Sequence, residues 1–140
     1  MNNLSTQIST TREQSERLLT MGVKPKTADV YLKFDGNPYF ITYTLKVREV
    51  HSKMGEDDFP AWSLSRLISM LPDEIPDTKP GFPPHHTELI KHKSGYNLSI
   101  RRYTADCLVG THIENDPIEC CVSMIEWLIK NNHFNKEYLK

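Results

Sequence analysis

The sequence contains little glycine and little cysteine, and both shortages exclude familiar kinds of site. Only six of the 140 residues are glycine, and the chain has neither a Walker loop nor the glycine fingerprint of dinucleotide-binding proteins. We therefore expect no glycine-rich loop that cradles a phosphate. The three cysteines are Cys107, Cys120 and Cys121. Because their number is odd and two are adjacent, we expect reduced thiols rather than a disulfide framework.

An excess of charge of one sign is also missing. Seventeen basic and eighteen acidic residues leave a net charge of -1, so the chain lacks the electrostatic signature of a dedicated duplex-DNA binder. No apolar run approaches the roughly 20 residues that span a bilayer. The first residues lack the basic and apolar regions of a signal peptide. These absences predict a cytoplasmic protein that does not enter a membrane.

The length and the pattern of apolar residues predict a single α+β domain with a mainly antiparallel sheet and helices packed on it. Residues 1–9 are polar and without periodicity, so we expect a flexible tail there and the domain over residues 10–140. The expected order is α-β-β-α-β-β-β-α. Its helices are expected near 11–21, 63–71 and 117–130, and its strands at 29–34, 39–47, 87–93, 96–103 and 106–113.

Capping signals mark where the helices begin and end. Thr10 with Glu13 and Thr11 with Gln14 form two overlapping capping boxes, and Gly22 suits the left-handed position after the first helix. The middle helix is expected to begin after Ser63 and to stop before Pro72. Asp116 and Pro117 mark the start of the last helix.

Apolar residues at regular spacing indicate the core. The middle helix carries one stripe, at Leu64, Leu67, Ile68 and Leu71. The last helix carries a longer one, at Ile118, Cys121, Val122, Ile125, Leu128 and Ile129. In the strand over 39–47 the expected core face consists of Tyr39, Ile41, Tyr43, Leu45 and Val47. Of these residues we expect six to be nearly inaccessible: Val122, Ile125, Ile129, Leu67, Ile68 and Ile41.

No arrangement of residues predicts catalysis or a bound cofactor. His85, His86 and His92 come nearest to a metal cluster, but adjacent histidines on an extended chain point to opposite sides, so solvated loop histidines are the favoured interpretation. Cys107 and His112 would lie on opposite faces of one strand, which does not support a nucleophile and its base. We therefore predict no catalytic, cofactor-binding or metal-binding residue.

Two groups of residues are candidates for binding. Trp62 and Trp127 lie at helix margins, where they either close the edge of the core or contact a protein partner. The second group combines basic and aromatic side chains near one hairpin, as some single-strand binders do, although a solvated outer face is the favoured interpretation. Its members are Lys91, Lys93, Arg101, Arg102 and Tyr103.

Three separated segments carry a resemblance to a known group of proteins. They are "TREQSERLLTMGVKPKTAD", "PAWSLSRLISMLP" and "NDPIECCVSMIEWLIKN". In this order they resemble a group of small uncharacterised proteins of Bacteroidetes, many of them associated with phages or mobile elements. The resemblance covers roughly residues 11–132. It implies no activity, cofactor or catalytic residue.

These observations lead to a functional hypothesis and its alternatives. We predict a small non-enzymatic protein, of phage or prophage origin, that binds another protein, because no catalytic arrangement is visible and two tryptophans lie at helix margins. The alternative is a weak single-stranded nucleic-acid binder that uses the basic and aromatic residues named above, although the near-neutral charge makes nucleic acid the less favoured partner. An enzyme would need polar groups that converge in a pocket.

Overall fold

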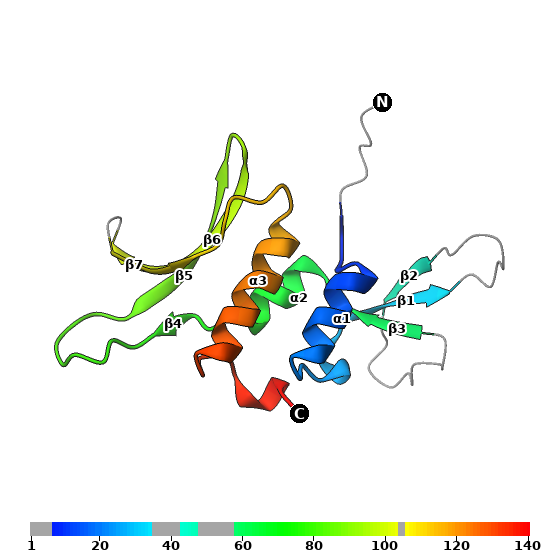
Figure 1. The fold of residues 1–140 in the computed structure, drawn as a ribbon, viewed down its shortest axis with the longest axis horizontal. Helices are drawn as coiled ribbons and strands as arrows, with labels where there is room; N and C mark the ends of the chain where they lie inside the picture. The colour runs from blue at the N-terminus through cyan, green and yellow to red at the C-terminus, as the bar shows by residue number, and fades with distance from the viewer. Residues whose placement is uncertain (1–6, 35–42, 48–57, 104–105) are drawn as a thin grey trace.

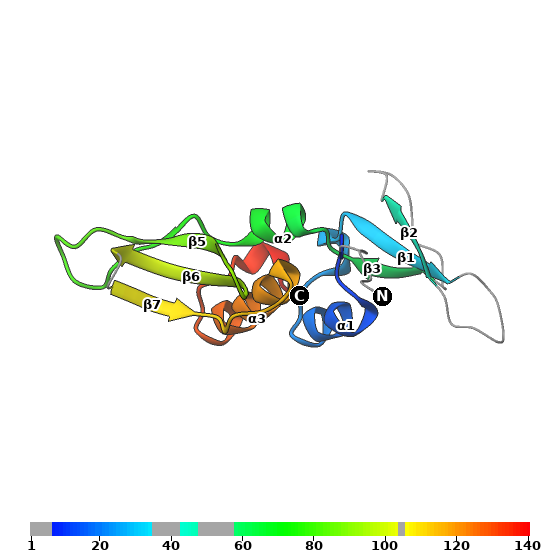
Figure 2. The ribbon, with the colours of Figure 1, turned by 90° about the horizontal axis from the view of Figure 1, so that it is seen from above.

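The computed structural model describes residues 7–34, 43–47, 58–103 and 106–140. Three α-helices lie between two antiparallel sheets: α1 (Arg12–Thr20), α2 (Leu64–Met70) and α3 (Pro117–Lys130) (Figure 1). Seen from above, the molecule is elongated, with the helices in the middle and one sheet toward each end (Figure 2). The α+β class is confirmed, but the strands form two sheets where a single one was expected.

The smaller sheet has the strand order β2-β1-β3. It consists of β1 (Val30–Phe34), β2 (Tyr43–Val47) and β3 (Asp58–Ala61). Strand β3 was not predicted, because its four residues contain a proline and show no alternation. It pairs with β1 at the edge of the sheet, and α1 packs beside it.

The larger sheet has the strand order β4-β5-β6-β7. It consists of β4 (Glu74–Ile75), β5 (His85–His92), β6 (Gly95–Tyr103) and β7 (Asp106–Gly110). The two residues of β4 lie inside a proline-rich segment, residues 72–86, which is why the sequence pattern did not reveal them. Side chains of β6 that face the helices, among them Leu98 and Ile100, are buried against α3.

The predicted helix ends are largely confirmed. Thr11 caps α1, and its capping box with Gln14 is complete. Thr10 does not form the second box; its hydroxyl is 2.8 Å from Ser15 Oγ and accepts a hydrogen bond from the backbone of Trp62. Gly22 follows with a φ of 96°, the left-handed conformation that glycine adopts without penalty.

The core is formed mainly by α3. Val122 and Ile125 of α3 are fully buried, as predicted, and so is Leu67 of α2. Cys120 and Met124 are buried as well, so the apolar face of α3 is wider than the predicted stripe. The reason is that α1, α2 and β6 all contact this helix. A helix enclosed on several sides buries most of its circumference.

Three predictions about the core need correction, and one lies outside the described residues. Ile68 is 42% exposed, because α2 buries Leu67 and Met70 instead and Ile68 lies about 100° round the helix from Leu67. Ile129 is only half-buried, in the last turn of α3. Val47 is 79% exposed at the end of the edge strand β2. Ile41 falls outside the described part of the chain.

Near both ends of the described chain, residues make backbone contacts with segments that are distant in sequence. Ser9, predicted to belong to a flexible tail, is buried and forms a bridge with Ser63. At the other end a 3-10 turn, η2 (Lys136–Tyr138), lies beside the segment that follows α1 (Figure 1). The amide of Lys24 donates to Tyr138 O at 2.8 Å, and that of Lys140 donates to Gly22 O at 2.8 Å.

Candidate functional site

Trp62 is part of the core. It is 0% exposed, and its indole Nε1 donates a 3.0 Å hydrogen bond to Thr27 Oγ1. Thr27 belongs to η1 (Pro25–Thr27), so the indole ties the start of α2 to the turn after α1. The interpretation of Trp62 as a core anchor is confirmed. Its role as a partner contact needs correction, because no part of a fully buried side chain reaches a partner's surface.

Trp127 is only half-buried on α3. Its ring stacks on that of His133, with 5.7 Å between the centroids and 16° between the planes. Its backbone carbonyl accepts a 2.8 Å hydrogen bond from Asn131 Nδ2. The indole therefore has one stacked neighbour and keeps part of its surface accessible.

A pocket of about 190 Å³ opens beside Trp127, between α3 and the segment that includes the end of β7. We call it the Trp127 pocket. Its walls are Val109, Gly110, Thr111, His112, Glu114, Ser123, Met124 and Trp127. Small-molecule sites usually measure about 300–1,000 Å³, whereas a cavity of about 150 Å³ holds a benzene ring. The Trp127 pocket therefore has the size for one apolar side chain rather than for a whole cofactor.

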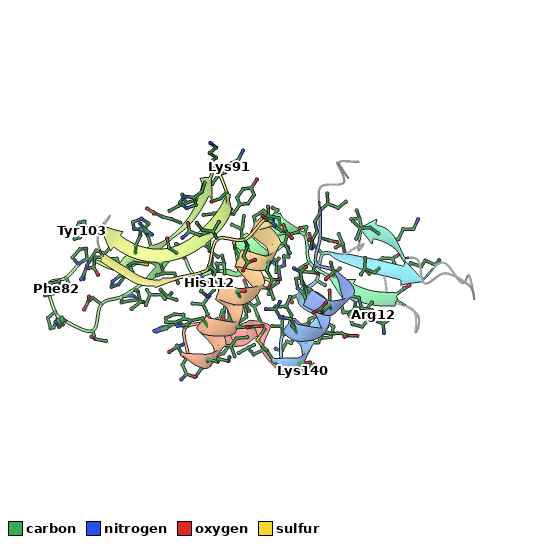
Figure 3. The ribbon with its side chains drawn as sticks, turned by 45° about the horizontal axis from the view of Figure 1, so that its top comes forward. Arg12, Phe82, Lys91, Tyr103, His112 and Lys140 are labelled. Atoms are coloured by element: carbon green, nitrogen blue, oxygen red, sulfur yellow. The ribbon has the colours of Figure 1, made fainter. Side chains whose placement is uncertain are left out.

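The wall of the pocket opposite α3 is fixed by hydrogen bonds to β6. Thr111 donates its amide to Leu98 O and accepts from the Leu98 amide through Oγ1, both at 2.9 Å. The amides of Glu114 and Tyr96 each donate to the other's carbonyl. Figure 3 places His112, which this segment carries, next to α3. The pocket is thus a built feature of the structure, not a gap left by a loose loop.

Gly95 permits this close approach. A Cβ at this position would lie 2.4 Å from Glu114 O, and the φ of 146° is one that other residues rarely adopt.

Behind the same wall, Cys120 donates its thiol to Tyr96 O at 3.3 Å, and burial raises the pKa of that thiol. Burial also raises the pKa of Cys121, to about 12. Both thiols stay protonated at neutral pH and act as core side chains.

Strand β7 borders the Trp127 pocket and is an edge strand. It pairs with β6 on one side, and no other strand among the described residues pairs with its second side. Leu108 is 43% exposed on this edge, and Ile113 just beyond it is 52% exposed. An unpaired edge offers backbone donors and acceptors to another extended chain. The edge of β7 and the Trp127 pocket therefore form one continuous candidate site.

The predicted basic and aromatic group does not come together. Lys91 lies opposite Tyr96, and Arg101 lies opposite His86, so the two basic side chains are on different faces of the sheet. Lys93 is in the hairpin turn. Tyr103 ends β6, roughly 20 Å along the strand from Tyr96. Figure 3 shows Lys91 and Tyr103 at separate ends of the sheet.

Arg102 has a structural environment of its own. Its side chain is 12% exposed and makes ion pairs at 2.5 Å with both Asp77 and Asp106. The guanidinium carbon lies 5.0 Å from the centroid of the Phe82 ring. The hydrogen bond to Asp106 raises the pKa of Arg102, and the backbone amide of Lys79, together with Arg102, lowers the pKa of Asp77. Arg102 fastens the proline-rich segment to the sheet, so little of its charge is presented to a ligand.

The histidines are dispersed. His85 is buried, while His86 is exposed and 2.7 Å from Glu88, so the two point to opposite sides as predicted. His92 lies 2.8 Å from Asn97 Oδ1 in the hairpin. Within the described ranges no group of three or more His, Cys, Asp or Glu side chains is placed to hold a metal ion.

Cys107 is exposed, and its thiol donates to Val109 O.

Sequence analysis missed most of the candidate site. It identified Trp127, but it gave no role to Val109 of β7 or to Ser123 and Met124 of α3. No local signal connects them, because the pocket exists only where β7 meets α3. An edge strand is equally invisible in a sequence, since edge position depends on the strand order.

Comparison with known proteins finds no match: no family model, no curated protein and no solved structure is similar to this chain. The resemblance to small Bacteroidetes proteins therefore stays a prediction. No helix in the described part of the chain is both long and apolar enough to cross a membrane. The candidate site rests on its geometry alone.

Proposed function

We propose that this protein is a peptide-recognition module that binds an extended segment of another protein. The segment pairs with the free edge of β7 and inserts one apolar side chain into the Trp127 pocket. The observation that carries the proposal is the position of a pocket of about 190 Å³ directly beside the edge of β7 that pairs with no other strand among the described residues. Addition of a strand to a sheet edge is a common mode of peptide recognition.

The geometry explains why the two features belong together. In an extended peptide, alternate side chains point to the same face. Val109 faces the helices, because it pairs with the buried Ile100, and it also lines the pocket. A peptide strand next to β7 therefore directs every second side chain toward α3. One of them reaches the indole of Trp127 and the thioether of Met124.

The expected affinity is modest. Burial of one apolar side chain contributes about 1.5–3 kcal/mol, and each backbone hydrogen bond contributes about 0.5–1.5 kcal/mol. Loss of translational freedom and ordering of the peptide cost at least about 4 kcal/mol. Four or five hydrogen bonds and one anchor then correspond to a micromolar or weaker Kd, typical of a reversible signalling or scaffolding contact.

The first test fills the pocket. Linear peptides selected from a random display library on the intact protein serve as probes, and their Kd is measured by fluorescence anisotropy. Ser123→Phe places a ring where the anchor would go, so we expect binding to weaken at least tenfold. Ser65→Phe is the matched control, because Ser65 is exposed on α2, away from the pocket. It should leave the Kd unchanged.

The second measurement locates the peptide. Bound peptide should slow amide hydrogen exchange within residues 106–111, because new backbone hydrogen bonds protect the edge. Chemical-shift changes should centre on the same strand and on Trp127. Peptides that bind equally well to Ser123→Phe, or that protect a different part of the chain, would overturn the proposal.

A further inference from the structure

A second cavity, of about 450 Å³, lies away from the Trp127 pocket and is lined by different residues. We call it the basic cavity. It is formed by Lys24, Lys26, Thr27, Arg66, Glu137 and Tyr138. These residues come from η1 and the residue before it, from α2 and from η2, so three segments distant in sequence converge on one space. Its volume falls in the usual range of small-molecule sites, about 300–1,000 Å³.

Arg66 is held rigidly at the cavity. Its Nε donates a 2.7 Å hydrogen bond to Thr27 O, and its guanidinium carbon lies 5.6 Å from the centroid of the Tyr138 ring. Nη1 is 3.4 Å from Ser69 Oγ. No acceptor for Nη2 is found among the described residues. A guanidinium fixed in this way is ready to bind an anion without losing side-chain entropy.

The two lysines complete the positive charge. Lys24 Nζ donates to Glu137 O at 3.0 Å, which keeps the ammonium group at the cavity. Lys26 is exposed beside it. The only carboxylate among the lining residues is Glu137, whose side chain is exposed. Three cations and one anion surround this cavity in a chain whose net charge is -1. The positive charge is therefore a local feature, not a result of composition.

We infer that the basic cavity binds a small organic phosphate. A phosphate monoester carries up to two negative charges, which matches the excess of cations, and its oxygens match the donor geometry of a guanidinium and two ammonium groups. The cavity is larger than a phosphate ion, so it has room for the organic part. The Tyr138 ring already has two close neighbours, the Arg66 guanidinium and the tilted ring of Phe134, so we assign the recognition to charge rather than to stacking. This inference does not depend on peptide binding.

Titrations with inorganic phosphate, phenyl phosphate and benzoate test the inference. Backbone amide shifts are followed in the intact protein at constant ionic strength. Phenyl phosphate should give saturable shifts at residues 24–28, 66 and 137–138. Inorganic phosphate should bind there more weakly, because it leaves the rest of the cavity empty. Benzoate should bind least, because it carries a single charge.

Charge reversal provides the control. Lys26→Glu removes one positive charge and adds a negative one. At a separation of about 5 Å in water, this corresponds to a loss of affinity of roughly tenfold for a singly charged anion and roughly a hundredfold or more for a doubly charged one. Lys91→Glu makes the same change on an exposed lysine of the larger sheet, away from the cavity, and should leave the affinity unchanged. Both sites are exposed, so both variants should keep the wild-type spectrum elsewhere. Equal loss in the two variants, shifts spread over all lysines, or no saturation would overturn the inference.

Discussion

At the scale of single residues, burial decides which apolar side chains of the helices contribute to the stability of the fold. Ile125 is 0% exposed, whereas Ile68 is 42% exposed although both were predicted to lie in the core. Their sequence environments are similar, since each belongs to an apolar stripe at helical spacing. The difference arises because α3 is covered by two helices and a strand, while the shorter α2 leaves one side open.

This difference yields a matched pair of substitutions. Ile125→Ala should lower the free energy of unfolding by about 2–5 kcal/mol, because the lost transfer energy is joined by the cost of a cavity. Ile68→Ala should cost less than about 1 kcal/mol, since solvent already reaches that side chain. Urea denaturation measures both. Similar losses in the two variants would mean that α2 turns Ile68 toward the core and would contradict its exposure to solvent.

At the scale of elements, α1 and α3 are tied by a network of charges. Arg17 Nη1 lies 2.6 Å from Glu119 Oε1, and its Nη2 lies 2.8 Å from Glu126 Oε1. Gln14 donates to the second oxygen of Glu119 at 2.7 Å. Gln14, the partner of Thr11 in the capping box of α1, thus belongs to the same network. Partial burial opposes ionisation of Glu119, but the hydrogen bonds from Arg17 and Gln14 outweigh it, so its pKa is lowered.

The sign of this shift predicts how stability depends on pH. A carboxyl whose pKa is lower in the folded state stabilises the fold above its ordinary pKa of 4.5, and this contribution is lost as the pH falls through the folded value. The Glu119→Gln variant should therefore be less stable than the wild type at pH 7 and should approach it at pH 3. Thermal unfolding across this range measures the difference. A gap that stays constant with pH would contradict the assignment.

At the scale of the whole molecule, the distribution of charge bears on the nucleic-acid alternative. The basic residues chosen for it are divided between two faces, a hairpin turn and an ion-paired segment. Single-strand binders need a continuous groove of positive charge along which the backbone runs. The basic cavity, in contrast, gathers its charge around a compact space that suits a small anion.

We therefore expect no measurable binding of a mixed-sequence single-stranded oligonucleotide at micromolar protein and physiological salt. Affinity carried by three or four phosphate contacts would fall roughly tenfold between 50 and 200 mM salt, since each contact contributes a slope of about -0.7. Fluorescence anisotropy at several salt concentrations measures it. Salt-sensitive binding that Arg101→Glu removes, while the fold is kept, would restore the alternative.

The sequence alone determined the local features of this protein. The cap at Thr11, the glycine after α1, the start of α3 after Asp116 and the β5–β6 hairpin are confirmed, because each depends on neighbouring residues and their intrinsic preferences. The burial of Val122 and Ile125 follows from periodicity in the same way. These features involve contacts over a few positions, where the pattern of side chains is sufficient.

Only the tertiary structure decided the rest. The division of the strands into two sheets, the edge position of β7 and the rotation of α2 that exposes Ile68 all depend on contacts between distant segments. Trp62 and Trp127 both lie at helix margins in the sequence, yet Trp62 is fully buried and hydrogen-bonded to η1 while Trp127 lines an open pocket. The Trp127 pocket and the basic cavity each combine residues from separate elements, so no local pattern encodes either. The free energy that fixes them comes from packing between elements, which acts regardless of separation along the chain.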